Sequence, residues 1–144
     1  MRVSDILKAK GRAVCAVRPD ATIADAVAAL DQFGIGALVV SEDGSTIEGI
    51  VSERDIVRAM HREGEDVRDR PVRDVMTKEV VTCVPAEQVD YMMSVMTEER
   101  FRHVPVLDSE KLAGIITIGD VVASRVAELE REAEALEQYI QYGR

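Results

Sequence analysis

Aromatic residues, cysteine and histidine are all scarce in this sequence of 144 residues. Aromatic residues make up 3% of the chain and Trp is absent, so a hydrophobic core must be built from Val, Ile, Leu, Ala and Met. The two cysteines, Cys15 and Cys83, form no Cys-x-x-Cys motif, and His61 and His103 lie far apart. These spacings argue against a zinc or iron–sulfur site, and nothing in the sequence calls for a metal.

An excess of basic residues is also lacking. The formal net charge is −9, with 27 acidic and 18 basic residues, which argues against a nucleic-acid-binding surface. No apolar run approaches the roughly 18 residues of a membrane-spanning helix, and the first residues contain no apolar leader segment. Two thiols in such an acidic chain are typical of a reducing compartment. The sequence therefore predicts a soluble, cytoplasmic protein that contacts neither nucleic acid nor membrane.

Motifs of the common catalytic sites are missing as well. The chain has no Gly-x-x-x-x-Gly-Lys and no Gly-x-Gly-x-x-Gly, and it offers no Ser-His-Asp arrangement. Gly34-Ile35-Gly36 is an isolated Gly-x-Gly and carries no weight alone. We therefore expect a protein that is not an enzyme.

What the sequence does contain is an internal repeat, which takes priority over other patterns. Apolar residues make up 47% of the chain, as expected for a globular protein. Segments recur at a spacing of 65 to 69 positions: 3–7 at 72–76, 17–19 at 83–85, 37–40 at 103–106 and 49–55 at 114–120. The sequence thus divides into a first repeat (1–60), a charged linker (61–71), a second repeat (72–124) and a C-terminal amphipathic helix (125–144).

Each repeat predicts the order β-α-β-β-α. The expected strands cover 13–17, 37–40 and 49–52 in the first copy and 80–84, 104–107 and 114–117 in the second. A helix follows the first strand of each copy, and another begins near Asp55 or Asp120. Because a repeat of about 65 residues cannot build a sufficient core alone, we expect the two repeats to pack as one α+β module with pseudo-two-fold symmetry.

The C-terminal segment has its own pattern. Apolar residues spaced 4, 3, 4, 3 and 4 apart form a short heptad seam surrounded by glutamates: Val122, Val126, Leu129, Ala133, Leu136 and Ile140. Two interpretations remain open. The helix packs on its own module, or it pairs with a second subunit in a homodimer.

These motifs resemble the CBS-domain family, specifically a stand-alone tandem pair (a Bateman module). The resemblance rests on the repeat starts at 5–7 and 74–77, on Gly-h-h-[Ser/Thr]-x-x-Asp (h is apolar) at 49–55 and 114–120, and on 102–106. It covers residues 1 to about 125. It implies a sensor module for signal transduction or energy sensing, which often forms homodimers and binds AMP, ADP, ATP or NAD in two clefts between the repeats.

The resemblance also implies a role for each matching residue. In the first cleft Asp120 would bind the ribose hydroxyls, Thr117 would contact ribose or phosphate, and Arg102 and His103 would face the phosphates. The purine would lie among Ile115, Cys15, Ala16, Ile35, Gly36 and Ala37. In the second cleft Asp55 and Ser52 would take the ribose, Arg54 the phosphate, and the base would contact Ile50, Val81, Thr82 and Phe101. Gly36 and Ala37, which occupy the second cleft's phosphate position, carry no charge, so we expect tighter phosphate recognition at Asp120, or different ligands in the two clefts.

Each assignment has a structural alternative. Asp55 and Asp120 suit helix N-caps, since a carboxylate there accepts bonds from free backbone N–H groups. A solvated surface position would equally explain the basic side chains of Arg102, His103 and Arg54. Inert core positions would explain Cys15 and Cys83. The competing functional hypothesis is therefore a protein-interaction module whose clefts are unoccupied, with an effector partner that the sequence does not identify.

Overall fold

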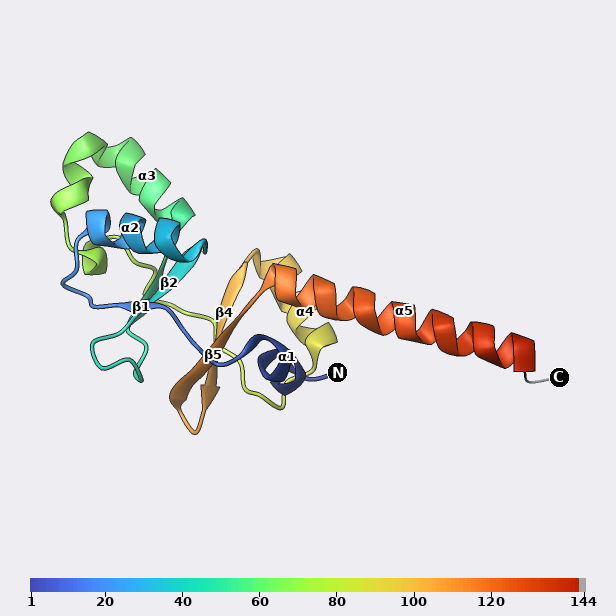
Figure 1. The fold of residues 1–144 in the computed structure, drawn as a ribbon. Coiled ribbons are helices and arrows are strands. Elements are labelled where there is room, and N and C mark those ends of the chain that lie inside the picture. Colours follow the sequence, from blue (N-terminus) through green and yellow to red (C-terminus); the bar gives the residue numbers. More distant parts are fainter. Residues whose placement is uncertain (143–144) are drawn as a thin grey trace.

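The computed structural model describes residues 1–142, and it confirms an α+β fold of two similar halves followed by a long helix (Figure 1). The elements are α1 (Val3–Lys10), β1 (Ala16–Val17), α2 (Ile23–Phe33), β2 (Ala37–Val40), β3 (Gly49–Ser52), α3 (Glu53–Glu63), α4 (Val89–Glu99), β4 (His103–Asp108), β5 (Lys111–Thr117) and α5 (Ile118–Tyr142). Two 3₁₀ helices, η1 (Gly64–Asp69) and η2 (Val72–Asp74), connect α3 to the second half.

Each half contains a small sheet. In the first, β2 pairs in parallel with β1 and antiparallel with β3. In the second, β4 pairs antiparallel with β5. All four residues of β2 are buried, which explains why this strand is continuously apolar rather than alternating.

The first strand of each repeat is shorter than the sequence predicts. Only Ala16 and Val17 of the expected strand 13–17 are in β1, and the expected strand 80–84 is reduced to a single parallel bridge between Cys83 and Val106. In the first repeat the Val39 N–H donates to the Cys15 carbonyl at 3.2 Å. The matching position in β4 is Pro105, which has no N–H to donate, so the second ladder cannot extend.

The segment that precedes each repeat packs on the other repeat. Val3, Ile6 and Leu7 of α1 belong to the core formed by α4, β4, β5 and α5, and α1 lies beside these elements in Figure 1. Conversely, Val67 and Val72 join the core of α2, β2, β3 and α3. The two halves are therefore interlocked, and neither core is complete without chain from beyond its own repeat.

A glycine makes room for each crossing segment. A Cβ added at Gly114 would lie 2.7 Å from Leu7 Cδ2, and one at Gly49 would lie 2.6 Å from Met76 Sδ. Leu7 and Met76 occupy matching positions in the repeat. The glycine that opens the Gly-h-h-[Ser/Thr]-x-x-Asp motif is thus explained by packing.

The connecting segment 61–71 is folded against the first half. Helix α3 continues to Glu63, and Val67 in η1 has no exposed surface. Arg70 forms ion pairs with Glu63 and Asp74, which raise the pKa of its guanidinium. A segment that looks like a charged spacer therefore contributes a core residue.

Helix α5 combines the closing helix of the second repeat with the C-terminal helix, without a break near residue 125. Its beginning packs on α4, and its distal half projects away from the body (Figure 1). The predicted tail extends to residue 144, and its last two residues lie outside the described range. Within residues 1–142 no helix is both long enough and apolar enough to cross a bilayer.

Candidate functional site

The two motif aspartates occupy equivalent positions at the starts of α3 and α5. The Asp55 N–H donates to Ser52 Oγ, and the Ser52 N–H donates back to Asp55 Oδ2 at 2.9 Å. Thr117 and Asp120 repeat this arrangement, at 3.1 Å and 2.9 Å. Both pairs are capping boxes in which Ser52 or Thr117 caps the helix and the aspartate lies three residues further on, so the interpretation of Asp55 and Asp120 as N-caps is wrong in position, although both help to cap their helices. Both carboxylates remain half-buried rather than enclosed, and this leaves them accessible to a ligand.

Asp120 forms an ion pair with a residue that the motif did not include. Lys10, in the last turn of α1, places Nζ 2.6 Å from Asp120 Oδ2. Burial raises the pKa of Asp120, but the hydrogen bonds from Lys10 and Thr117 outweigh it, so the pKa lies below its ordinary value. Asp120 is therefore an anion at neutral pH, able to accept hydrogen bonds from hydroxyl groups.

Asp55 receives only neutral side-chain donors. Ser52 Oγ donates to Oδ2 at 3.1 Å, and Thr77 Oγ1 donates to Oδ1 at 3.2 Å. Thr77 follows η2 and pairs with Ile50 of β3. The segment that contacts Asp55 is thus the counterpart of α1, which contacts Asp120.

His103 lies where the two repeats meet. A Cβ on Gly36 would lie 3.3 Å from the His103 ring, so the missing side chain allows this approach. Burial, together with the positive charges of Lys10 and Arg102, lowers the pKa of His103, although Glu53 and Asp120 oppose the shift. Neutral His103 offers a ring N–H to a ligand rather than a full charge. The structure therefore brings together three residues of the predicted first cleft, Gly36, His103 and Asp120, and adds two that were not predicted, Lys10 and Glu53.

The backbone is symmetric here while the side chains differ. The Glu53 N–H donates to the Gly36 carbonyl at 3.0 Å, and the Ile118 N–H donates to the Arg102 carbonyl at 2.9 Å. Gly36 and Arg102 therefore occupy equivalent positions, and Arg102 is exposed. Only the second repeat presents a cation at this position. This is the asymmetry on which the expected difference between the clefts depends.

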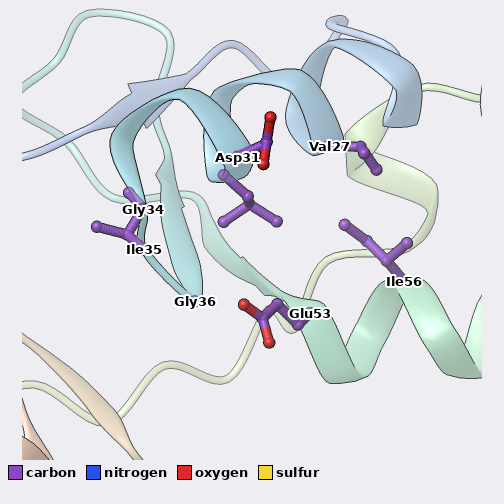
Figure 2. A pocket seen from close by; sticks show the side chains of 8 residues that line it. Val27, Asp31, Gly34, Ile35, Gly36, Glu53 and Ile56 are labelled. Atoms are coloured by element: carbon purple, nitrogen blue, oxygen red, sulfur yellow. The ribbon is translucent and has the colours of Figure 1, made fainter.

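Two cavities touch the predicted base-binding residues, but each lies within one repeat. One, of about 500 Å³, lies between α2 and the start of α3 and is lined by Ile35 and Gly36, with Asp31 and Glu53 as its carboxylates (Figure 2). The other, of about 210 Å³, is lined by Val81 and Thr82 beside α4. Neither reaches Asp55 or Asp120. These two cavities therefore do not join the base-binding and ribose-binding residues.

The remaining predicted residues are distributed more widely. Ile115 and Ile50 lie half-buried on β5 and β3, Ala37 is buried at the start of β2, and Ala16 is exposed. Cys15 packs against the first core and Phe101 against the second. Arg54 is exposed on α3, with no ion pair among the described residues. Burial raises the pKa of Cys83 to about 12, which fits an inert core thiol.

Motif matching missed Lys10 and Thr77 for an identifiable reason, whereas Glu53 occupies a variable position inside the 49–55 motif. Lys10 and Thr77 lie on the crossing segments, outside the motif whose aspartate they contact. The signal was the repeat itself, since the segments 3–7 and 72–76 also match one another. No group of three or more potential metal ligands occurs among residues 1–142.

Comparison with known proteins supports this architecture. The CBS domain family model matches residues 3–62 and 72–126. The mitochondrial CBS domain-containing protein CBSX3 of Arabidopsis thaliana is 36% identical over 151 residues, which cover 98% of this chain and 72% of the relative.

Solved structures give the same result. The CBS-domain containing protein ATU1752 of Agrobacterium tumefaciens superposes with a TM-score of 0.84 and 45% identity, covering 87% of this chain and 99% of that one. The CBS domain pair of protein MJ0100, solved with 5′-methylthioadenosine and S-adenosyl-L-methionine, shares the fold at a TM-score of 0.78 and 23% identity, over 89% of this chain and 98% of its own. The chain therefore belongs to the CBS-domain family and carries two CBS domains in tandem.

Proposed function

We propose that this protein is a non-catalytic sensor module that binds adenine nucleotides, such as AMP, ADP, ATP or NAD, in two clefts between its repeats. The observation that carries the proposal is the pair of half-buried carboxylates, Asp55 and Asp120. Each lies at a helix N-terminus beside the crossing segment. A ribose cis-diol offers two donors to such a carboxylate, and a helix N-terminus favours an anion nearby. The adenosine compounds bound by the MJ0100 pair support this class of ligand.

The interlocked cores suggest how a bound ligand is sensed. A ligand in either cleft contacts one repeat directly and lies beside the segment that completes it. Binding changes the packing of the repeats only if the ligand has different affinities for two arrangements. The signal would then pass to an effector partner, which remains unidentified. A cytoplasmic location likewise stays a prediction, and the Arabidopsis relative is mitochondrial.

Thermal unfolding against a panel of AMP, ADP, ATP and NAD tests the proposal. A ligand at 100 times its dissociation constant should raise the free energy of unfolding by about 2.7 kcal/mol. Asp120→Ala should remove most of this stabilisation and Asp55→Ala less of it, because the phosphate-facing cation lies in the Asp120 cleft. Asp66→Ala, which removes an exposed carboxylate from η1, is the matched control.

The opposite results are equally clear. If no adenine nucleotide stabilises the wild-type chain, the clefts are unoccupied and the interaction-module hypothesis is favoured. If Asp55→Ala and Asp120→Ala lose the same stabilisation, the proposed ranking of the clefts is wrong.

We also propose that the protein forms a homodimer that is fastened by α5. Val126, Leu129, Leu136 and Ile140 of the heptad seam are between 47% and 60% exposed. This exposure disfavours a helix packed along its whole length on its own module, and it leaves the seam free for the same helix of a second subunit.

A further inference from the structure

Lys10 distinguishes the two clefts. It ends α1, the helix that crosses to the second repeat, and its Nζ lies 2.6 Å from Asp120 Oδ2. Both side chains are partly exposed, at 31% and 25%. At Asp55 the crossing segment instead supplies the hydroxyl of Thr77. The carboxylate of Asp120 thus has a charged side-chain donor, whereas the carboxylate of Asp55 has neutral ones.

The hydrogen bonds leave part of Asp120 available. Lys10 and the Thr117 N–H both bind Oδ2, and no residue among 1–142 donates to Oδ1. At Asp55 both oxygens already accept hydrogen bonds from side chains. A ligand hydroxyl therefore finds an unused acceptor at Asp120 Oδ1, whether or not Lys10 remains on Oδ2.

Lys10 is one of two cations near His103, which also lies near the carboxylates of Glu53 and Asp120. Its charge and that of Arg102 both act on His103, whose ring approaches Gly36 of the other repeat. An ion pair between partly exposed side chains contributes little stability, so an ammonium group can exchange its carboxylate partner for a phosphate at small cost. Bonds between an ammonium and a phosphate are themselves among the stronger hydrogen bonds.

We propose that Lys10 makes the Asp120 cleft selective for phosphorylated adenosine compounds over uncharged or cationic ones. Asp120 Oδ1 accepts a ribose hydroxyl, while Lys10 and Arg102 attract the phosphate. A ligand without phosphate gains nothing from these cations, and a cationic ligand is repelled by them. The Asp55 cleft, with Thr77 at its carboxylate, lacks this selectivity. This inference rests on the proposed function and assigns a ligand class to one of its two clefts.

The test compares adenosine with AMP by calorimetric titration. The wild-type chain is measured first, and Asp55→Ala is then used as the parent so that the Asp120 cleft alone reports. In the parent, AMP should bind about ten times more tightly than adenosine, which corresponds to about 1.4 kcal/mol. Lys10→Met should remove this preference by weakening AMP and leaving adenosine unchanged or tighter.

Two further variants separate recognition from folding. Lys8→Met changes the other lysine of the same helical turn, which makes no ion pair with Asp120, and should leave the preference intact. Lys10→Arg keeps the charge and should retain most of the preference. Melting curves of all variants check that each one is folded to the same extent as the parent.

The results that would contradict this inference can be distinguished from those that would contradict the proposed function. An unchanged ratio of AMP to adenosine affinity in Lys10→Met, or an equal weakening of both, shows that Lys10 has only a structural role, while the proposed function stands. Failure of the wild-type chain to bind AMP or adenosine overturns this inference, and failure to bind ADP, ATP and NAD as well overturns the proposed function with it.

Discussion

At the level of the single residue, Asp55 and Asp120 have a structural role that leaves room for the proposed one. The capping boxes show that each carboxylate holds its own helix N-terminus. Capping does not exhaust an aspartate, because the two oxygens of a carboxylate have about four acceptor sites. The unused acceptor capacity, rather than the residue type, is what makes Asp120 the stronger candidate for ligand contact.

His103 gives a pH dependence at the same scale. Because the pKa of folded His103 lies below its ordinary value of 6.5, the unfolded chain takes up a proton first as the pH falls. The free energy of unfolding should therefore decrease as the pH drops below about 6.5. Denaturant unfolding at a series of pH values measures this slope, and His103→Gln should flatten it.

Titration of Asp120 does not contribute to the slope in this pH range. Its pKa is lowered from 3.8, so the stability it contributes is present above that value and is lost only as the pH falls through its lower folded pKa. A decrease between pH 6.5 and 5 that persists in His103→Gln would show that another group is responsible.

At the scale of elements, the crossing segments determine the packing. Val3 and Leu7 are almost fully buried, although they lie on a helix that precedes the first repeat. The repeat pattern predicts neither that residues 3–10 form a helix nor which core that helix joins. The glycines opposite Leu7 and Met76 record this packing, because only a residue without Cβ fits against them.

Gly114→Ala tests the close packing between α1 and β5. The added methyl group would overlap Leu7 Cδ2, and we expect a loss of about 1–3 kcal/mol in the free energy of unfolding. Leu7→Ala alone should cost about 2–5 kcal/mol by leaving a cavity. In the double variant the two changes compensate in part, so its loss should be smaller than the sum. Additive losses from chemical denaturation would show that the two residues do not interact.

At the scale of the whole molecule, α5 is the element that reaches beyond the module. Its 25 residues span about 37 Å, and only the first part contacts the body. Glu130, Glu132 and Glu137 flank the apolar seam, so two such helices would repel one another at low ionic strength. The hydrophobic seam must outweigh this repulsion for the proposed homodimer to form.

Substitutions in the seam test the homodimer. Leu129→Glu combined with Leu136→Glu should weaken self-association at least tenfold, or about 1.4 kcal/mol, as measured by sedimentation equilibrium. Added salt should strengthen the wild-type dimer by screening the glutamates. Gln138→Glu adds the same charge outside the seam and serves as the control. An unchanged mass for the double variant would place any dimer contact elsewhere.

The sequence by itself determined the repeat, the family and the helices and strands from the second element of each repeat onward, but not α1 or the two 3₁₀ helices. Matching segments 65 to 69 positions apart need only covalent order to be recognised, and β2 and β3 have the bounds that the pattern predicts. It also placed the two aspartates at helix starts, because capping is a local property. It overestimated the first strand of both repeats, and in the second repeat the reason is that Pro105 has no N–H to donate to a partner more than twenty positions away.

Only the tertiary structure decided which segments meet. The exchange of crossing segments puts Lys10 on Asp120 and Thr77 on Asp55, through contacts that span 110 and 22 positions. Such contacts arise because each crossing segment buries its apolar side chains in the core of the other repeat. The hydrophobic effect is non-directional, so the choice of core leaves no local pattern in the sequence. The difference between the two clefts is for this reason a property of the packed molecule and not of either motif.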